Sequence, residues 1–274
     1  MDPTPPTPRN PGGRGRKSGV VQSSKRPTSN RAFYLLIAAV AVGGIAWLTY
    51  QSTRSTNVVQ ASPIDTTLPK VASEGYVIGS PTARIEVTEF GDFECPACGR
   101  FSVLTEPDIR KRFVTSGLVR WRFIDFPLSI HRNTWQASRA AACADEQGRF
   151  WAFHDYLYET QDQWNGETTD NPDKFMKQAA RQLGLDAAKF DQCVDSKKYQ
   201  AKIQAHLALG EARKVGQTPT FIIGSLQFPG ALNEDQMAKY INEELAKAPP
   251  APAAAPGGDS AKSAPLPPAT KKPG

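Results

Sequence analysis

Cysteine and histidine are scarce in this chain, which has four cysteines and three histidines among 274 residues. A structural zinc site needs four ligands, which usually come as two closely spaced Cys or His pairs. Cys95 and Cys98 are the only such pair, since Cys143, Cys193, His131, His154 and His206 are scattered along the sequence. We therefore expect no bound metal ion and no other cofactor, with a metal clip at the cysteine pair as a less favoured interpretation.

Basic residues are not in excess in the middle of the chain, although the whole chain has a net charge of +6. Residues 1–31 hold seven basic residues and one acidic residue, and residues 247–274 hold four lysines and one aspartate. The remaining residues, 54–246, therefore have a net charge of −3. Because nucleic-acid binding needs a basic folded surface, we expect no nucleic-acid partner.

Both ends also lack the apolar periodicity that a folded core requires. Residues 1–31 are rich in Pro, Gly, Ser and basic residues, and residues 247–274 are rich in Pro and Ala. Such compositions are typical of disordered segments. We expect a disordered basic segment over residues 1–31 and a disordered tail over residues 247–274.

A charge-free run of 22 residues, 32–53, follows the basic segment. As a helix it would cover about 33 Å, which matches a hydrocarbon core of about 30 Å. The excess of basic residues before the run places the N-terminus in the cytoplasm. We predict a single-pass transmembrane anchor over residues 32–53, then a linker over residues 54–74 and an extracytoplasmic domain.

A cleaved signal peptide is the alternative interpretation of this run. The small-residue sequence Val59 to Ala61 resembles a cleavage site and predicts a mature chain that begins at Ser62. A basic region of 31 residues is long for a signal peptide, which favours the uncleaved anchor. In both cases the domain faces an oxidising compartment.

Residues 75–246 have the patterns of a mixed α/β domain. Alternating residues predict strands at 84–90 and 118–126 around a helix at 96–113, which is a parallel βαβ unit. Helical spacing then predominates within an insertion over about residues 130–214, and strands at 220–225 and 226–228 precede a last helix at 233–245. The order predicts an α/β sandwich with a helical insertion.

The sequence Cys95-Pro96-Ala97-Cys98 stands where the first helix of this domain should begin. Pro96 suits the first helical position, which puts Cys95 near the N-cap. There the free N–H groups and the helix dipole lower the pKa of a thiol and stabilise the thiolate. Cys98 follows almost one turn later, within reach of a mixed disulfide on Cys95. The spacing favours reversible thiol–disulfide exchange over two unreactive core cysteines.

The segment EFGDFECPAC, the later segment QTPTFIIG and the helical block between them resemble the DsbA-like thiol:disulfide oxidoreductases of the thioredoxin superfamily. The resemblance covers roughly residues 76–246. It implies a thioredoxin fold, βαβ…ββα, with an inserted helical domain. It also implies a catalytic domain outside a bacterial cytoplasmic membrane, exported cysteine-containing proteins as substrates, and reoxidation by a membrane quinone-linked partner of the DsbB or VKOR type.

The resemblance also assigns roles to individual residues. It implies that Cys95 is the surface nucleophile, that Cys98 is the buried resolving cysteine, and that a cis bond joins Thr218 to Pro219 and presents Thr218 to a bound peptide. An ordinary trans proline is the alternative. It further implies that Glu89 is a buried acid that relays the proton of Cys98. Alternatively, Glu89 is one of several acidic residues on a solvent-exposed edge strand.

Some relatives carry a structural disulfide in the insertion, which implies a bridge between Cys143 and Cys193. Two buried free thiols or an electron relay to the active pair are the alternatives. Ala97 and Thr218 replace the histidine and valine of the best-known strong oxidants. Because an alanine side chain cannot donate a hydrogen bond to a thiolate, we expect a less oxidising disulfide here.

These observations favour a membrane-anchored oxidoreductase that introduces disulfides into exported proteins. Two alternatives stay open. One is a disulfide reductase or isomerase, and the other is a non-catalytic module that binds exported polypeptides at Thr218 and Pro219. A binding module would not need both Cys95 and Cys98.

Overall fold

The computed structural model describes residues 30–54, 59–65 and 75–249. It divides the chain into two units, Met1–Asn57 and Val58–Gly274, which are described separately. Most of the basic N-terminal segment and of the Pro- and Ala-rich tail, both predicted to be disordered, lies outside the described residues.

The described part of the first unit is the helix α1 (Arg31–Arg54). Its stretch Arg31–Thr49 has a mean hydropathy of 2.0 and is long and apolar enough to cross a membrane. Signal sequences near an N-terminus share these properties, so the helix agrees with both interpretations of the run.

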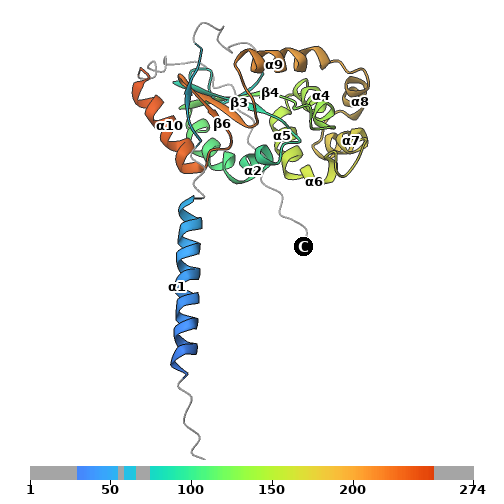
Figure 1. Cartoon of the computed structure of the whole chain (residues 1–274). Coiled ribbons are helices and arrows are strands. Elements are labelled where there is room, and N and C mark those ends of the chain that lie inside the picture. The colour runs from blue at the N-terminus through green and yellow to red at the C-terminus, as the bar shows by residue number, and fades with distance from the viewer. Residues whose placement is uncertain (1–29, 55–58, 66–74, 250–274) are drawn as a thin grey trace, which may run out of the picture. The chain divides into compact units, whose positions relative to one another are not determined.

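The second unit is built on a six-stranded sheet with the order β1-β6-β5-β3-β4-β2 (Figure 1). The central strands β3 (Ile85–Gly91) and β4 (Val119–Asp125) are parallel. The crossover between them holds α2 (Pro96–Leu104), α3 (Glu106–Ile109) and a π-helical turn, Arg110–Val114. The antiparallel pair β5 (Thr220–Ile223) and β6 (Leu226–Pro229) lies on the other side of β3. The predicted βαβ and ββ units are therefore present.

Two short strands at the sheet edges were not predicted. β2 (Tyr76–Ile78) pairs with β4, and β1 (Ser62–Pro63) pairs with β6, both antiparallel. Strands of two or three residues are too short to show alternation in the sequence. Because β1 falls within the predicted linker, part of that stretch is bound to the sheet edge.

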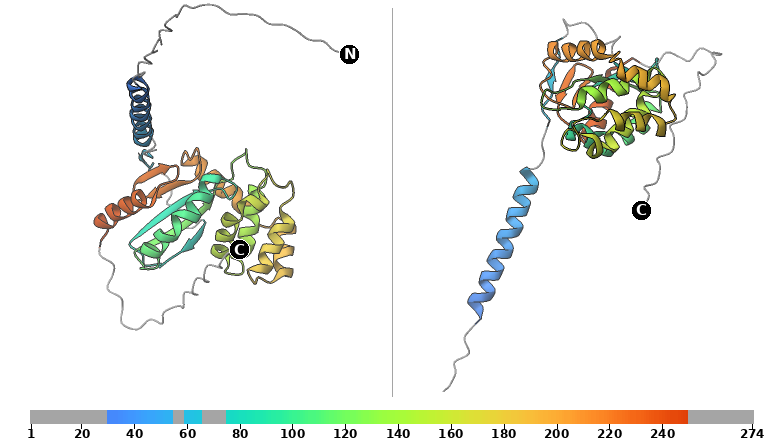
Figure 2. Two further views of the ribbon diagram at one scale, coloured as in Figure 1. Left: turned by 90° about the horizontal axis from the view of Figure 1, so that it is seen from below. Right: turned by 90° about the vertical axis from the view of Figure 1, so that its right-hand side faces the viewer.

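Helices fill the region between β4 and β5, as the periodicity predicted. They are α4 (Thr134–Asp145), α5 (Phe150–Glu159), α6 (Gln161–Trp164), α7 (Asp173–Gln182), α8 (Ala187–Asp195) and α9 (Gln200–Ala212). The last helix, α10 (Glu234–Lys247), begins with a capping box formed by Asn233 and Gln236. The compact block α4 to α8 lies to one side of the sheet (Figure 2).

The sheet separates two apolar clusters. On one face, Val87 and Trp121 pack with residues of α2, α3 and α10. On the opposite face, Phe90 and Ile124 pack against residues of α9. A third cluster fills the helical block and includes both Cys95 and Cys98, so the cysteine pair lies where the block meets the sheet.

A disulfide joins Cys143 of α4 to Cys193 of α8, with a Cα–Cα distance of 5.9 Å. The two residues are 50 positions apart in the sequence, and both are buried. The bond therefore closes a long loop within the helical block, whereas Cys95 and Cys98 carry free thiols.

Replacing Cys143 and Cys193 with alanine should lower the free energy of unfolding by about 4 kcal/mol, because the unfolded chain regains the freedom of a long loop. Urea unfolding of the oxidised protein measures the change. The matched control replaces Cys95 and Cys98 with alanine and leaves the long loop closed. A loss below about 1 kcal/mol would contradict a structural role for the bridge.

Candidate active site

Cys95 is the N-cap of α2, and Pro96 occupies the first helical turn. The backbone of Cys95 is extended, with φ −71° and ψ 121°. The Cys95 carbonyl accepts the first helical hydrogen bond from the Gly99 N–H at 3.0 Å. The Cys95 N–H donates to the Asp92 carbonyl at 3.1 Å, which closes the turn before the helix. This geometry directs the thiol towards the N–H groups at the start of the helix.

The two thiols of the pair differ in pKa. Hydrogen bonding by the neighbouring Cys98 thiol is the main cause that lowers the pKa of Cys95 to about 6, against the opposing effect of burial. The nearby Thr218 side chain and the N–H groups of Cys98 and Ala97 lower this pKa further. Burial is the main cause that raises the pKa of Cys98 well above its ordinary value, followed by its hydrogen bond to Cys95. At neutral pH Cys95 is therefore a thiolate and Cys98 a thiol.

Cys95 is more enclosed than the resemblance implied. Cys98 is 0% exposed, whereas Cys95, expected at the surface, is only 7% exposed. The segment before β5 helps to enclose it, because the Thr218 carbonyl oxygen lies 3.3 Å from Cys95 Sγ and accepts a hydrogen bond from it when Cys95 is protonated.

The peptide bond between Thr218 and Pro219 is cis. Thr218 is 7% exposed, and its hydroxyl has no hydrogen-bond partner in the described part of the chain. That hydroxyl is thus available to the Cys95 thiolate, as a donor of a kind that the side chain of Ala97 lacks.

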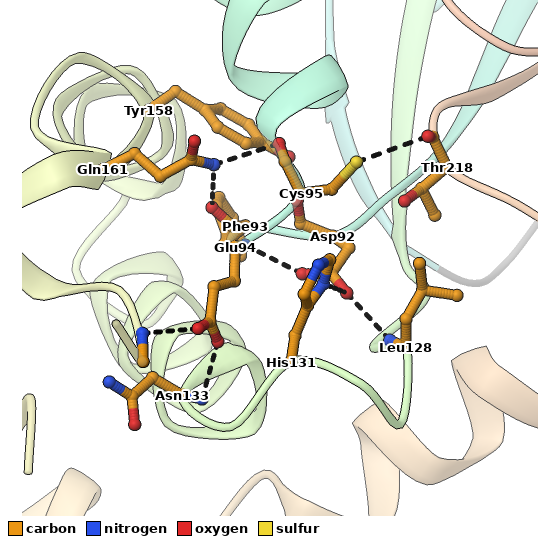
Figure 3. Close-up of polar contacts among 11 residues, drawn as sticks. Asp92, Phe93, Glu94, Cys95, Leu128, His131, Asn133, Tyr158, Gln161 and Thr218 are labelled. Atoms are coloured by element: carbon orange, nitrogen blue, oxygen red, sulfur yellow. Dashed lines mark hydrogen bonds and ion pairs between the residues drawn. The ribbon is translucent and has the colours of Figure 1, made fainter. Parts of the chain in front are cut away.

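Two buried carboxylates hold the loops around Cys95 (Figure 3). Asp92 accepts hydrogen bonds from the backbone N–H groups of Glu94 and Leu128, each at 2.8 Å, and pairs with His131 at 2.8 Å. That pairing with Asp92 raises the pKa of His131. Glu94 accepts from the Asn133 N–H at 2.6 Å and, through its other oxygen, from the N–H of Gly166.

The contacts of Glu94 leave no room for a side chain at residue 166. A Cβ atom on Gly166 would lie 2.7 Å from Glu94 Oε1. Helix α6 adds a further tie, since Gln161 Nε2 donates to the carbonyls of Phe93 at 2.7 Å and Cys95 at 3.0 Å. The helical insertion therefore holds the segment that leads into the nucleophile and the carbonyl of Cys95 itself.

Sequence reasoning missed Asp92, Glu94 and Gln161 as residues of the site. Asp92 and Glu94 are 0% and 7% exposed. In the sequence they stand on either side of Phe93, as two acidic residues of the kind usually found at the surface. The available signal was their position directly before Cys95, where carboxylates can bind the free N–H groups of an approaching loop. Their partners lie at residues 128–166, which no local pattern connects to them.

Glu89 is fully buried on β3, a central strand of the sheet, so the alternative of an exposed edge strand is wrong. Its side chain lies on the same face of the sheet as that of Val87, two residues earlier, and α2 packs on this face. Trp121 Nε1 donates to Glu89 Oε2 at 3.2 Å. Burial, and secondly the charge of Glu106, raise the pKa of Glu89 well above its ordinary value.

The histidines are engaged in separate places. Nδ1 of His131, His154 and His206 lies 2.8 Å from a carboxylate oxygen of Asp92, Asp155 and Asp125, respectively. Over the described ranges, no group of three or more His, Cys, Asp or Glu side chains is arranged to hold a metal ion.

The family model described as thioredoxin matches residues 72–243 of this chain, which includes the cysteine pair, Glu89 and the cis-proline segment. The chain belongs to the thioredoxin family. Among solved structures, alpha-DsbA1 of Wolbachia pipientis matches with a TM-score of 0.58 and 21% identity, over 66% of this chain and 93% of that one. The predicted DsbA-like thioredoxin fold with its helical insertion is therefore confirmed.

Two curated proteins that are similar to this thioredoxin-family chain differ in kind, since one is named as a disulfide bond formation protein and the other as an antiporter. A probable disulfide bond formation protein D of Bacillus anthracis is 28% identical over 173 residues, which are 62% of this chain and 78% of that protein. The Na(+)/H(+) antiporter NhaA 3 of Salinispora tropica is 28% identical over 224 residues, which are 78% of this chain and 33% of that protein. The chain thus spans about a third of the antiporter's length.

The Thr218→Val substitution should raise the pKa of Cys95 above about 6, because it removes a hydroxyl donor and keeps the side-chain shape. Thiolate absorbance at 240 nm, followed against pH in the reduced protein, measures the shift. Thr82→Val, at an exposed position before the start of β3 and so at the end of that strand away from Cys95, is the matched control and should leave the titration unchanged. Coincident titrations of wild type and Thr218→Val would show that the hydroxyl has no part in stabilising the thiolate.

Proposed function

We propose that this protein is a membrane-anchored, extracytoplasmic thiol:disulfide oxidoreductase that oxidises the thiols of exported proteins. The observation that carries the proposal is the separation in pKa between Cys95 and Cys98 at the start of one helix. One sulfur is an anion at neutral pH, and the other holds its proton. A disulfide exchange site needs such an unequal pair, and an inert core pair does not.

The proposed reaction begins with the Cys95–Cys98 disulfide. A substrate thiolate attacks Cys95, the bond to Cys98 breaks, and Cys98 leaves with the electron pair and takes up a proton. A second substrate thiolate then attacks the substrate sulfur of the mixed disulfide. Cys95 leaves as a thiolate, a good leaving group because its pKa is about 6. The substrate has gained a disulfide, and the enzyme has gained two electrons.

Thr218 and Pro219 are the proposed substrate-binding residues. The Thr218 carbonyl lies 3.3 Å from Cys95 Sγ, so a peptide whose cysteine reaches Cys95 passes along this backbone. An extended peptide there can exchange main-chain hydrogen bonds with residue 218, as strands do at a sheet edge. We propose Glu89 as the group that exchanges a proton with Cys98, because it is buried on the face of the sheet beneath α2.

Helix α1 is the proposed membrane anchor, with the basic N-terminal residues in the cytoplasm. A mature chain that began near Ser62 would indicate a cleaved signal peptide instead. Exported proteins with cysteines are the proposed substrates, and a membrane quinone-linked protein of the DsbB or VKOR type is the proposed reoxidant. The similarity to a probable disulfide bond formation protein D supports this role.

The Cys95 pKa bears on the direction of electron transfer. The nucleophilic cysteine has a pKa of about 7 in thioredoxin, a reductant, and about 3.5 in DsbA, a strong oxidant. The value of about 6 in this chain lies between them. A stabler thiolate favours the reduced enzyme and makes the disulfide more oxidising, so we propose a moderate oxidant. A reductase or isomerase is the second candidate, because the Cys95 pKa of about 6 lies nearer to the pKa in thioredoxin than to the pKa in DsbA.

The reduction potential of the Cys95–Cys98 pair tests the proposal. We expect a value between about −270 mV, that of thioredoxin, and about −120 mV, that of DsbA. Equilibration with glutathione, followed by alkylation and mass analysis, measures it in the full chain, with Cys143 and Cys193 as an internal reference that stays oxidised. A potential at or below that of thioredoxin would contradict the oxidase role, and a pair that never exchanges with glutathione would support a binding module.

A further inference from the structure

A second buried carboxyl group, Glu106, lies in the layer of helices that covers the active-site face of the sheet. Glu106 is the first residue of α3 and is 1% exposed. Arg110, one turn later, begins the π-helical turn. The Arg110 guanidinium donates to Glu106 Oε1 from Nε at 2.8 Å and approaches the same oxygen with Nη2 at 2.6 Å. A guanidinium does not lose its proton in proteins, so Arg110 and Glu106 form a buried, charge-assisted pair.

The other end of the guanidinium points towards solvent. Arg110 Nη1 donates to both carboxylate oxygens of Asp155, at 3.0 and 3.1 Å, and the side chain of Asp155 is 37% exposed. The guanidinium also stacks on Trp151, with its central carbon 4.4 Å from the ring centroid. These contacts hold Arg110 in one position, so the Glu106 carboxylate is held in one position as well.

Glu106 and Glu89 each have one carboxyl oxygen without a hydrogen-bond partner among the described residues. These atoms are Glu106 Oε2 and Glu89 Oε1, and both are buried. The charge of Glu106 is, after burial, the largest cause that raises the pKa of Glu89. A neighbouring negative charge disfavours ionisation of a buried carboxyl group. Arg110 pairs directly with Glu106, whereas the raised pKa of Glu89 favours a proton on that carboxyl group before the disulfide opens.

Other charged or titratable groups also face Glu89. Arg110 approaches it from the π-helical turn, Cys95 and Cys98 from α2, and Tyr158 from α5. While the cysteines form a disulfide they carry no charge, and burial keeps Tyr158 neutral by raising its pKa well above the ordinary value. Glu106 is therefore the anion that faces Glu89 in the oxidised enzyme.

We propose that Glu106 is a positioning residue that holds the proton on Glu89, so that Glu89 can donate it to Cys98 when the disulfide opens. The inference rests on the proposed oxidase function. As the substrate thiolate bonds to Cys95, the Cys95–Cys98 bond breaks and its electron pair passes to Cys98. The proton of the Glu89 carboxyl group moves to that sulfur, and Glu89 becomes a carboxylate. Without the proton, Cys98 would leave as a buried thiolate beside a second anion.

The test is the pH profile for reduction of the full-length oxidised protein by dithiothreitol, with each rate divided by the concentration of dithiothreitol thiolate. For wild type we expect this rate to fall where Glu89 loses its proton, at a pH well above the ordinary range of glutamate. Glu106→Gln should move that inflexion down by about 1–2 pH units, because a neighbouring like charge is removed. Glu89→Gln should have no inflexion.

Asp108→Asn is the matched control, since Asp108 lies on the same short helix but is exposed, and its profile should coincide with that of wild type. An infrared measurement gives a second readout. The C=O stretch of a protonated buried carboxyl group should persist in wild type to a pH above the ordinary range of glutamate, should be absent in Glu89→Gln, and should disappear at a lower pH in Glu106→Gln than in wild type.

Glu106→Gln leaves Arg110 without its buried partner, which endangers folding. The double variant Glu106→Gln, Arg110→Met removes both charges and avoids an unpaired buried ion. It should shift the inflexion in the same direction but less, because the lost guanidinium also favoured ionisation of Glu89. Profiles that coincide with wild type would overturn the role of Glu106 alone. Failure of dithiothreitol to reduce the wild-type pair would overturn the proposed function itself.

Discussion

The start of helix α2 is the feature on which the rest of the site depends. A helix begins with N–H groups that have no partner within the helix, and here the sulfur of Cys95 lies among them. Since Pro96 lacks an N–H, the donors that remain are those of Ala97 and Cys98. The proposed exchange chemistry follows from this placement, because it makes one of two chemically identical thiols an anion and leaves the other protonated.

The helical insertion is needed to hold that helix start in place. Asp92 and Glu94 bind backbone N–H groups from the insertion, and Gln161 binds the backbone of the nucleophile itself. The disulfide of the insertion joins α4 to α8. Asn133, the residue directly before α4, donates its backbone N–H to Glu94. The Cys143–Cys193 bridge therefore supports the block of helices that positions Cys95 and Cys98.

The elements of the fold were largely predictable, because long strands and amphipathic helices have clear periods. The short edge strands at residues 62–63 and 76–78 were not, because their pairing depends on distant strands. Within the site, the sequence pointed to Cys95, Cys98 and Pro219 through a local motif and a resemblance. It did not point to Glu94 or Glu106, because a buried carboxylate is indistinguishable from a surface one until its partners, Gly166 and Arg110, are known.

Cys95 is the sulfur that bonds to substrates in the proposed reaction, and trapping of mixed disulfides tests this role most directly. With Cys98 changed to serine, the Cys95 thiolate can still attack the disulfide of an oxidised substrate and release one substrate thiolate, but the mixed disulfide that results cannot be resolved within the enzyme. We expect this full-length variant to accumulate exported proteins in complexes that a reductant releases, and a variant with Cys95 changed to serine to accumulate none. Equal capture by both variants, or capture through Cys98 alone, would contradict this role.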